Sequence, residues 1–225
     1  MFSSLTHFTA QDWPGRLAAI AWVAGCPLRC HYCHNPELAL GKGSLAEEEV
    51  LDFLRRRQGL LDGLVLSGGE ATLLPGIDGF CRRVRELGFK IKLDTAGTRP
   101  EVLKRLLEER LLDAVALDFK APNAEAFARV TGRRGSFDAF RRSLELVLDA
   151  DLDYCEVRST WHASLLAPQE LDAILDELER RRFRGTWALQ HFRRPPSGRI
   201  LGDLPEHRPA AFNPGPRPFT VLVRN

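Results

Sequence analysis

Three cysteines lie on one short stretch of the chain, at Cys26, Cys30 and Cys33. Their spacing, C-x3-C-x2-C, lets a single loop wrap three thiolates around one centre, and thiolates are soft ligands that suit iron–sulfur clusters and zinc. Three ligands on a four-iron cluster leave one iron open for a substrate. The spacing alone also allows a zinc site completed by His31 or His34, or no metal at all.

Further polar residues follow short apolar runs later in the chain. Two carboxylates suit a hard cation, and an ammonium group suits a carboxylate or ribose oxygens. A glycine pair after a strand lets the backbone approach a ligand closely, although plain turns use it too. An aspartate at a strand end can instead cap the next helix, and a lysine there can be solvated. The candidates are Gly68, Gly69, Glu70, Asp94, Thr95, Asp118 and Lys120.

Two charges alternate along another apolar run. Tyr154, Glu156 and Arg158 are two residues apart, so they share one face of a strand. Two buried charges in that position need each other or a ligand. Glu156 and Arg158 therefore form either a structural ion pair or part of a site.

The elements that must position these residues alternate between strand and helix. Such alternation implies a parallel sheet with right-handed crossovers, and the length before the proline-rich tail fits six units. We therefore expect an α/β fold: an open six-stranded parallel (β/α)6 partial TIM barrel with an irregular C-terminal tail. The candidates then share the carboxyl-end rim, where active sites of such barrels lie. Strands are expected at about 17–24, 64–66, 90–94, 114–119, 154–160 and 186–192, and helices at about 44–57, 77–87, from 100, 136–150 and 168–184.

Composition narrows the class of protein. The chain has 225 residues, is 44% hydrophobic and 28% charged, and has a net charge of +2. These values exclude a disordered chain, and no apolar run is long enough to span a membrane. The first residues lack the layout of a signal peptide, so we expect a cytoplasmic protein whose five cysteines form no structural disulfides. The small net charge gives no reason to expect direct nucleic-acid binding.

The end of the chain differs from the rest in charge. Residues 180–225 contain ten arginines and two acidic residues, and half of the fourteen prolines lie between 195 and 218. We expect residues 1–194 to form the barrel domain and residues 195–225 to be a basic segment packed on it. Such a segment could dock an acidic surface of a large partner.

The cysteine motif carries a family resemblance. C-x3-C-x2-C is the signature of the radical S-adenosylmethionine (SAM) superfamily. The extension C-H-N-P-E and the lead-in D-W-P-G-R at residues 12–16 resemble the activases of glycyl-radical enzymes. Within that group the chain is most similar to activating proteins of anaerobic ribonucleoside-triphosphate reductase, over residues 8–193.

The resemblance implies a definite chemistry. The three cysteines hold a [4Fe–4S] cluster, and SAM chelates the fourth iron. One electron cleaves SAM to a 5′-deoxyadenosyl radical, which takes hydrogen from a glycine of a partner, here an anaerobic ribonucleotide reductase. A flavodoxin- or ferredoxin-type protein donates the electron. A first rival is a small-molecule enzyme similar to 7-carboxy-7-deazaguanine synthase, which lacks support from the lead-in and extension. A second is a zinc-binding module, which leaves the strand-end acids unexplained.

The resemblance also assigns roles along the rim. The G-G-E turn binds the methionyl amino group, and a monovalent cation lies near Asp94 and Asp118. Relatives usually have asparagine where this chain has Ala96, which leaves the neighbouring contacts in doubt. Asp12 faces the glycine loop of the partner, although a turn aspartate before a proline is the plainer alternative. Arg158 and Ser159 contact SAM. Gln190 or Phe192 packs on the adenine, or else packs in the core or at the rim. The other residues of the expected cofactor site are Gly68, Gly69, Glu70, Thr95 and Lys120.

Overall fold

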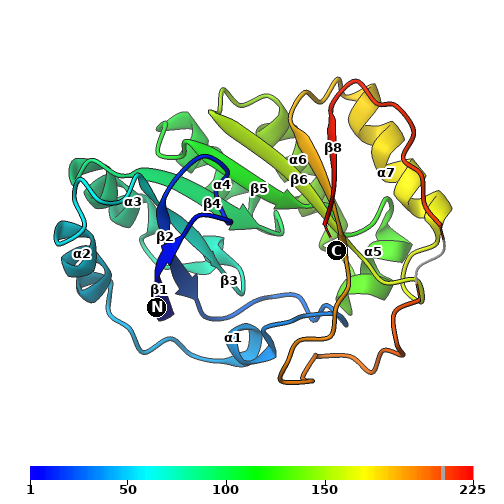
Figure 1. Ribbon diagram of the computed structural model, residues 1–225, viewed down its shortest axis with the longest axis horizontal. Coiled ribbons are helices and arrows are strands. Elements are labelled where there is room, and N and C mark those ends of the chain that lie inside the picture. Colours follow the sequence, from blue (N-terminus) through cyan, green and yellow to red (C-terminus); the bar gives the residue numbers. More distant parts are fainter. Residues whose placement is uncertain (209–210, 225) are drawn as a thin grey trace.

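One sheet runs through the molecule. A computed structural model describes residues 1–208 and 211–224, and over these residues the sheet has eight strands in chain order (Figure 1). β1 (Phe2–Thr9) pairs antiparallel with β2, and all later neighbours pair in parallel. The remaining strands are β2 (Ala18–Val23), β3 (Gly63–Gly68), β4 (Lys90–Thr95), β5 (Ala114–Asp118), β6 (Tyr154–Trp161), β7 (Thr186–His191) and β8 (Thr220–Arg224).

All six predicted strands are present, but the sheet has eight strands, so the predicted number of strands is wrong. The six expected runs are β2 to β7, and the α/β class with a mostly parallel sheet is confirmed. β1 was missed because it lies at the sheet edge and mixes exposed polar residues with only two buried ones, Phe2 and Thr9. β8 was missed because it follows a proline-rich stretch that predicts irregular structure.

The tail is therefore not irregular throughout. Its last described residues form β8, which adds a parallel strand next to β7. Arg217 donates to Asp176 at 2.8 Å and to Glu179 at 2.9 Å, both on α7 (Pro168–Arg180). The ring of Phe219 lies 5.4 Å from that of Phe183. A boundary between two domains at residue 194 stays a prediction.

Helices cover the outer face of the sheet (Figure 1). Four more of the predicted helices are present besides α7, and each buries one stripe, as α3 does with Ile77, Phe80, Cys81 and Val84. Two short helices and a 3-10 turn were not predicted. The helices are α1 (Pro36–Leu40), α2 (Glu47–Arg55), η1 (Ala71–Leu73), α3 (Ile77–Glu86), α4 (Pro100–Glu108), α5 (Ala124–Thr131) and α6 (Phe137–Leu148).

The core explains why the central strands tolerate so few polar residues. β2 to β5 are buried along most of their length, as expected for parallel strands covered on both faces. Their carboxyl ends point to the lower side of Figure 1, where the loop after β2 and part of the tail also run. Among the described residues no helix is long and apolar enough to cross a membrane.

Candidate active site at the carboxyl ends of the strands

Residues 25–35, the cysteine loop, begin just beyond β2. The two helices missed from sequence hold this loop by its backbone. On α1, Leu38 accepts from the N–H of Gly25 at 2.7 Å, and Ala39 accepts from the N–H of Cys26 at 3.1 Å. At the end of α5, the carbonyls of Val130 and Thr131 accept from His31 at 3.1 Å and from Arg29 at 2.7 Å. The backbone of the loop is thus held at its beginning and in its middle by the protein itself.

The tail covers the cysteine loop from the other side. The N–H of Gly202 donates to the carbonyl of His31 at 2.9 Å, and Arg199 pairs with Glu37 of α1 at 2.8 Å. A Cβ at Gly202 would lie 2.6 Å from that of His31, so this contact requires glycine. Between α1 and the tail lies a hollow of about 600 Å³. The tail therefore belongs to the surroundings of the loop.

The three thiols of the cysteine loop are free and partly or fully buried. Burial raises the pKa of Cys26 to about 12 and also raises the pKa of Cys30. Burial thus favours the protonated thiols of Cys26 and Cys30 until a metal displaces the protons. Among the described residues, no three His, Cys, Asp or Glu side chains converge on a single ion. A cubane does not need such convergence, because its three thiolates bind three different irons.

Tyr32 carries a buried polar atom without a partner. Tyr32 lies between Cys30 and Cys33 in the sequence and is only 6% exposed, and its hydroxyl has no hydrogen-bond partner among the described residues. The ammonium of Lys120 lies 5.8 Å from the centre of its ring. Burial raises the pKa of the Tyr32 hydroxyl, which therefore stays a donor. A donor left unsatisfied beside three thiols fits a loop shaped to receive a polar group.

Two glycines bring the turn after β3 against the cysteine loop. A Cβ on Gly69 would lie 2.1 Å from the carbonyl oxygen of Gly25, and one on Gly68, at φ +124°, would lie 2.4 Å from that of Val23. The N–H of Glu70 then donates to Gly25 at 2.9 Å. The turn therefore packs closely against the backbone that carries Cys26, and its predicted close approach to a ligand stays a prediction.

The carboxylate of Glu70 is used inside the protein. It is 1% exposed and accepts from the hydroxyls of Thr72 at 2.7 Å and Thr95 at 2.6 Å. Its second oxygen accepts from the backbone N–H of Ala96 at 2.9 Å. This last bond does not depend on the side chain at position 96, so the turn after β4 keeps it although asparagine is missing. Glu70 and Thr95 thus tie two rim turns together.

Asp94 and Asp118 meet at the ends of β4 and β5. The guanidinium of Arg158 lies between them, with Nη1 3.2 Å from Asp94 and Nε 3.0 Å from Asp118. Lys120 donates to the other oxygen of Asp118 at 3.1 Å, and Lys92 donates to the other oxygen of Asp94. Five ionised groups from three strands therefore form one network.

The network keeps both carboxyl groups ionised. Burial alone would raise the pKa of Asp118, but Lys120 and Arg158 lower it to about 2. Likewise, Arg158 and Lys92 outweigh burial and lower the pKa of Asp94. Opposite charges within hydrogen-bond distance favour the charged form in this way.

Comparison with known proteins identifies this arrangement. The model of the Radical SAM superfamily matches residues 20–181, well over half of the chain. The chain belongs to the radical SAM superfamily. The predicted membership is thus confirmed, and with it the cofactors of the family, a [4Fe–4S] cluster and SAM.

Relatives of this radical SAM protein include activating enzymes. It is 36% identical over 125 residues to a putative glycyl-radical enzyme activating enzyme of Methanocaldococcus jannaschii, which is 53% of this chain and 50% of that one. It is 34% identical over 152 residues to the pyruvate formate-lyase-activating enzyme of Clostridium pasteurianum, covering 63% and 62%. The chain thus spans between half and two thirds of the length of these relatives.

Solved structures share the fold at low sequence identity. Streptococcus suis SuiB bound to the precursor peptide SuiA aligns with a TM-score of 0.64 at 13% identity, covering 81% of this chain and 40% of SuiB. SuiB bound to S-adenosylmethionine aligns with a TM-score of 0.61 at 14% identity, covering 82% and 45%. These similarities confirm a radical SAM fold.

One sequence interpretation of the radical SAM site needs correction. Glu156 does not pair with Arg158; it is bound by Arg224 of β8, at 2.9 and 2.7 Å.

The hydroxyl of Ser159 is buried and already has partners inside the protein. It donates to the carbonyl of Phe119 at 2.9 Å and accepts from Trp187 at 3.1 Å, and its contact with SAM stays a prediction.

A monovalent cation between Asp94 and Asp118 does not fit these residues. All four carboxylate oxygens already accept from cationic groups, and Ser67 donates in addition to Asp94 at 3.1 Å. A metal ion would have to displace Arg158 or a lysine.

The remaining predicted residues lie outside this network: Gln190 and Phe192 lie near the rim, and Asp12 lies at the opposite, amino end of β2. Phe192 is 4% exposed, and its ring lies 5.4 Å from that of His34 in the cysteine loop. Gln190 is half-buried in β7, in register with Thr160 of β6. Asp12 is exposed in the turn after β1, where its carboxylate accepts from Thr9. Their contacts with cofactor or partner stay predictions.

Sequence reasoning missed several residues of the site. Lys92 could have been found, because a charge two residues before Asp94 falls on the same face of an apolar strand. The buried hydroxyl of Tyr32 and the role of Arg224 had no signal in the sequence, since both depend on which distant segments pack together.

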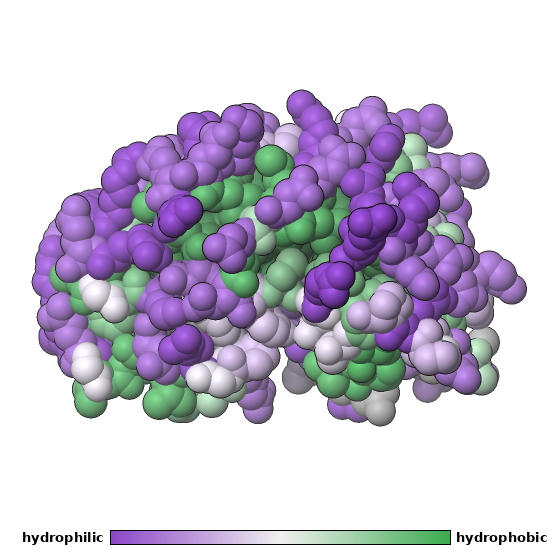
Figure 2. Space-filling view, turned by 90° about the horizontal axis from the view of Figure 1, so that it is seen from above, coloured by the Kyte–Doolittle hydropathy of each residue, from purple (hydrophilic) through white to green (hydrophobic). Residues whose placement is uncertain are grey.

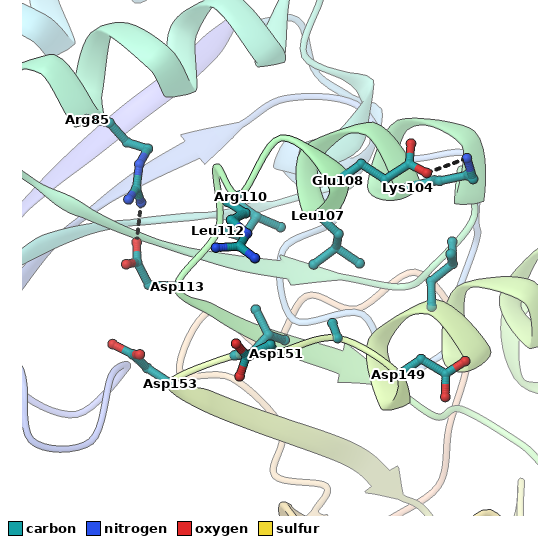
Figure 3. A pocket seen from close by; sticks show the side chains of 13 residues that line it. Arg85, Lys104, Leu107, Glu108, Arg110, Leu112, Asp113, Asp149, Asp151 and Asp153 are labelled. Atoms are coloured by element: carbon teal, nitrogen blue, oxygen red, sulfur yellow. Dashed lines mark hydrogen bonds and ion pairs between the residues drawn. The ribbon is translucent and has the colours of Figure 1, made fainter.

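The opposite end of the strands is built differently. A hollow of about 490 Å³ opens there between the loops before β5 and β6, where Arg85 pairs with Asp113 and Lys104 with Glu108 (Figure 3). Seen from above the view of Figure 1, a hydrophobic band crosses this side of the molecule between hydrophilic borders (Figure 2). None of the predicted site residues lines this hollow.

Proposed function

We propose that this radical SAM protein is the activating enzyme of a glycyl-radical enzyme, and that the partner is an anaerobic ribonucleoside-triphosphate reductase. The observation that carries the proposal is the cysteine loop, held against the Gly68–Gly69 turn at the rim that also holds Asp94, Asp118 and Lys120. The identity with two activating enzymes and the motif around the cysteines support the reaction type, and the resemblance of residues 8–193 to reductase activases supports the reductase as partner.

Each group of residues has a defined task in this proposal. Cys26, Cys30 and Cys33 hold the cluster, and the backbone bonds to α1 and α5 keep the loop in shape when the thiols lose their protons. When bound, the reduced cluster supplies the electron that cleaves SAM and so generates the radical that takes hydrogen from the partner's glycine. The charged network positions the polar groups of SAM, and Gln190 and Phe192 lie at the adenine side.

The predicted partner contact Asp12 lies away from this rim. Thr9 at the end of β1 pairs with Ala18 at the start of β2, so the turn between them is at the amino end of β2, whereas the cysteine loop follows the carboxyl end. A contact between Asp12 and the partner is therefore not part of this proposal. A flavodoxin- or ferredoxin-type protein is the proposed electron donor.

The test is radical formation on a partner. The protein is reconstituted with iron and sulfide without oxygen, then incubated with SAM, a reductant and either the anaerobic reductase or pyruvate formate-lyase from the same genome. We expect a glycyl-radical EPR signal on the reductase. A signal on the lyase alone would keep the activase and replace the partner.

Matched variants make the test specific. Cys30→Ala should abolish the signal, whereas Cys81→Ala, at an equally buried cysteine in α3, should keep it. Cleavage of SAM without a radical on either enzyme would point to a small-molecule substrate instead. Absence of any cleavage by the reconstituted protein would refute the proposal.

A further inference from the structure

Each carboxylate oxygen of Asp94 and Asp118 already accepts a hydrogen bond from a positively charged side chain. We propose that Arg158 is the built-in cation of this site: its guanidinium holds the two aspartates together, so the protein needs no monovalent metal ion there. The inference concerns the SAM site and does not depend on which enzyme is the partner.

The geometry of the guanidinium carries the proposal. Arg158 uses two different nitrogens, Nε for Asp118 at 3.0 Å and Nη1 for Asp94 at 3.2 Å. A planar group with donors on two edges can bridge two carboxylates in one plane, which a lysine cannot do. The side chain is only 17% exposed, so these bonds face little competition from water.

The charge count points the same way. Lys92 and Lys120 neutralise the outer oxygens of the pair, so three cations already face two carboxylates. One positive charge is left over before any metal ion is added. Glu156, the next acid on β6, does not offset it, because Arg224 binds both of its oxygens. A further cation would enter a network whose net charge is already positive, or would have to displace a group already bound there.

Replacement of ions tests the wild-type protein. Thermal unfolding of the cluster-free protein and SAM binding to the reconstituted protein are compared in sodium, potassium and tetramethylammonium chloride at equal ionic strength. We expect the melting temperature to be the same in all three, and the SAM affinity to agree within about twofold. An ion bound beside SAM would instead couple to it, typically by roughly 5- to 150-fold. A tenfold or larger gain that is selective for sodium or potassium would overturn the proposal.

Substitution of Arg158 tests the same claim from the other side. Arg158→Gln removes the surplus positive charge and frees the carboxylate oxygens that Arg158 now binds, so added potassium or sodium should raise its melting temperature and a thallium ion should bind, seen by thallium-205 NMR. Arg158→Lys, which keeps the charge, should respond less. The control is Arg85→Gln, which removes an arginine from a single aspartate at the far end of the strands (Figure 3) and should show no ion response. A folded Arg158→Gln protein that ignores these ions would refute the role given to Arg158; if it does not fold, the wild-type ion series decides alone.

Discussion

Removal of Arg224 should show whether the tail is part of the barrel. This residue comes from β8, and its guanidinium binds both oxygens of Glu156. Glu156 is 3% exposed, and within the described part of the chain the hydroxyl of Tyr154 is its one further side-chain donor. Arg224→Met would therefore leave a buried carboxylate without its cation.

The expected loss of stability follows from burial. Breaking a buried ion pair by removing one partner typically costs about 3–5 kcal/mol. Because the Arg224 side chain is 32% exposed, water can reach the carboxylate after substitution, and we expect the lower end, about 3 kcal/mol. For a chain of this length each kcal/mol corresponds to roughly 2–4 °C, so the melting temperature should fall by roughly 6–12 °C.

Chemical and thermal unfolding measure this loss, with two comparisons. Arg208→Met removes an exposed arginine from Glu206 in the same tail and should change stability by about 0.5 kcal/mol or less. The double variant Arg224→Met, Glu156→Met removes both charges and should recover most of the loss. If Arg224→Met is no more damaging than Arg208→Met, then β8 does not hold the buried charge and our account of the tail is wrong.

Three further predictions concern the rim. Alanine at any one of the three loop cysteines should abolish the iron–sulfur absorbance of the reconstituted protein, whereas Cys155→Ala should retain it; a fourth required cysteine would contradict the assignment. Glu70→Gln places an amide donor among the N–H and O–H groups that now donate to the carboxylate, so it should destabilise the fold by about 2 kcal/mol and weaken SAM binding, measured by urea unfolding and calorimetry. The pKa of Asp118 is held at about 2, below its unfolded value, so it should add about 2 kcal/mol of stability above about pH 4 that is lost as the pH falls towards about 2. Urea unfolding across that range should show a shallower slope for Asp118→Asn, and parallel curves would refute this.

Local patterns predicted the frame of the molecule well. Runs such as residues 114–119 are apolar on both faces, which is what a parallel strand between two layers requires, so β2 to β7 were found. The helical stripe from Ile77 to Val84 had the same clarity. What failed depended on pairing between distant segments. β1 is an edge strand of mixed composition and β8 follows a proline-rich stretch, so only their pairing with β2 and β7 shows them as strands, and the partner of Glu156 lies 68 residues away in the sequence.

For the site, too, local sequence predicted the segments but not the contacts between distant ones. Residue type and spacing were enough to place the cysteine loop and the acids at strand ends, because the carboxyl ends of parallel strands share one rim. The direction of individual side chains was not accessible. Ser159 and Glu70 lie within the expected segments, yet the side chains of both form hydrogen bonds with other groups of the protein. Only the packed structure shows which polar groups remain free.

The most direct test of the central claim follows a single hydrogen atom. The anaerobic reductase is prepared with α-deuterated glycine and incubated with the reconstituted protein, SAM and a reductant, and the 5′-deoxyadenosine formed is analysed by mass spectrometry. If this chain is the activase of that enzyme, the 5′-deoxyadenosine carries one deuterium and a glycyl-radical signal grows with it. Unlabelled 5′-deoxyadenosine in the same amount, with no radical on the reductase, would contradict the claim.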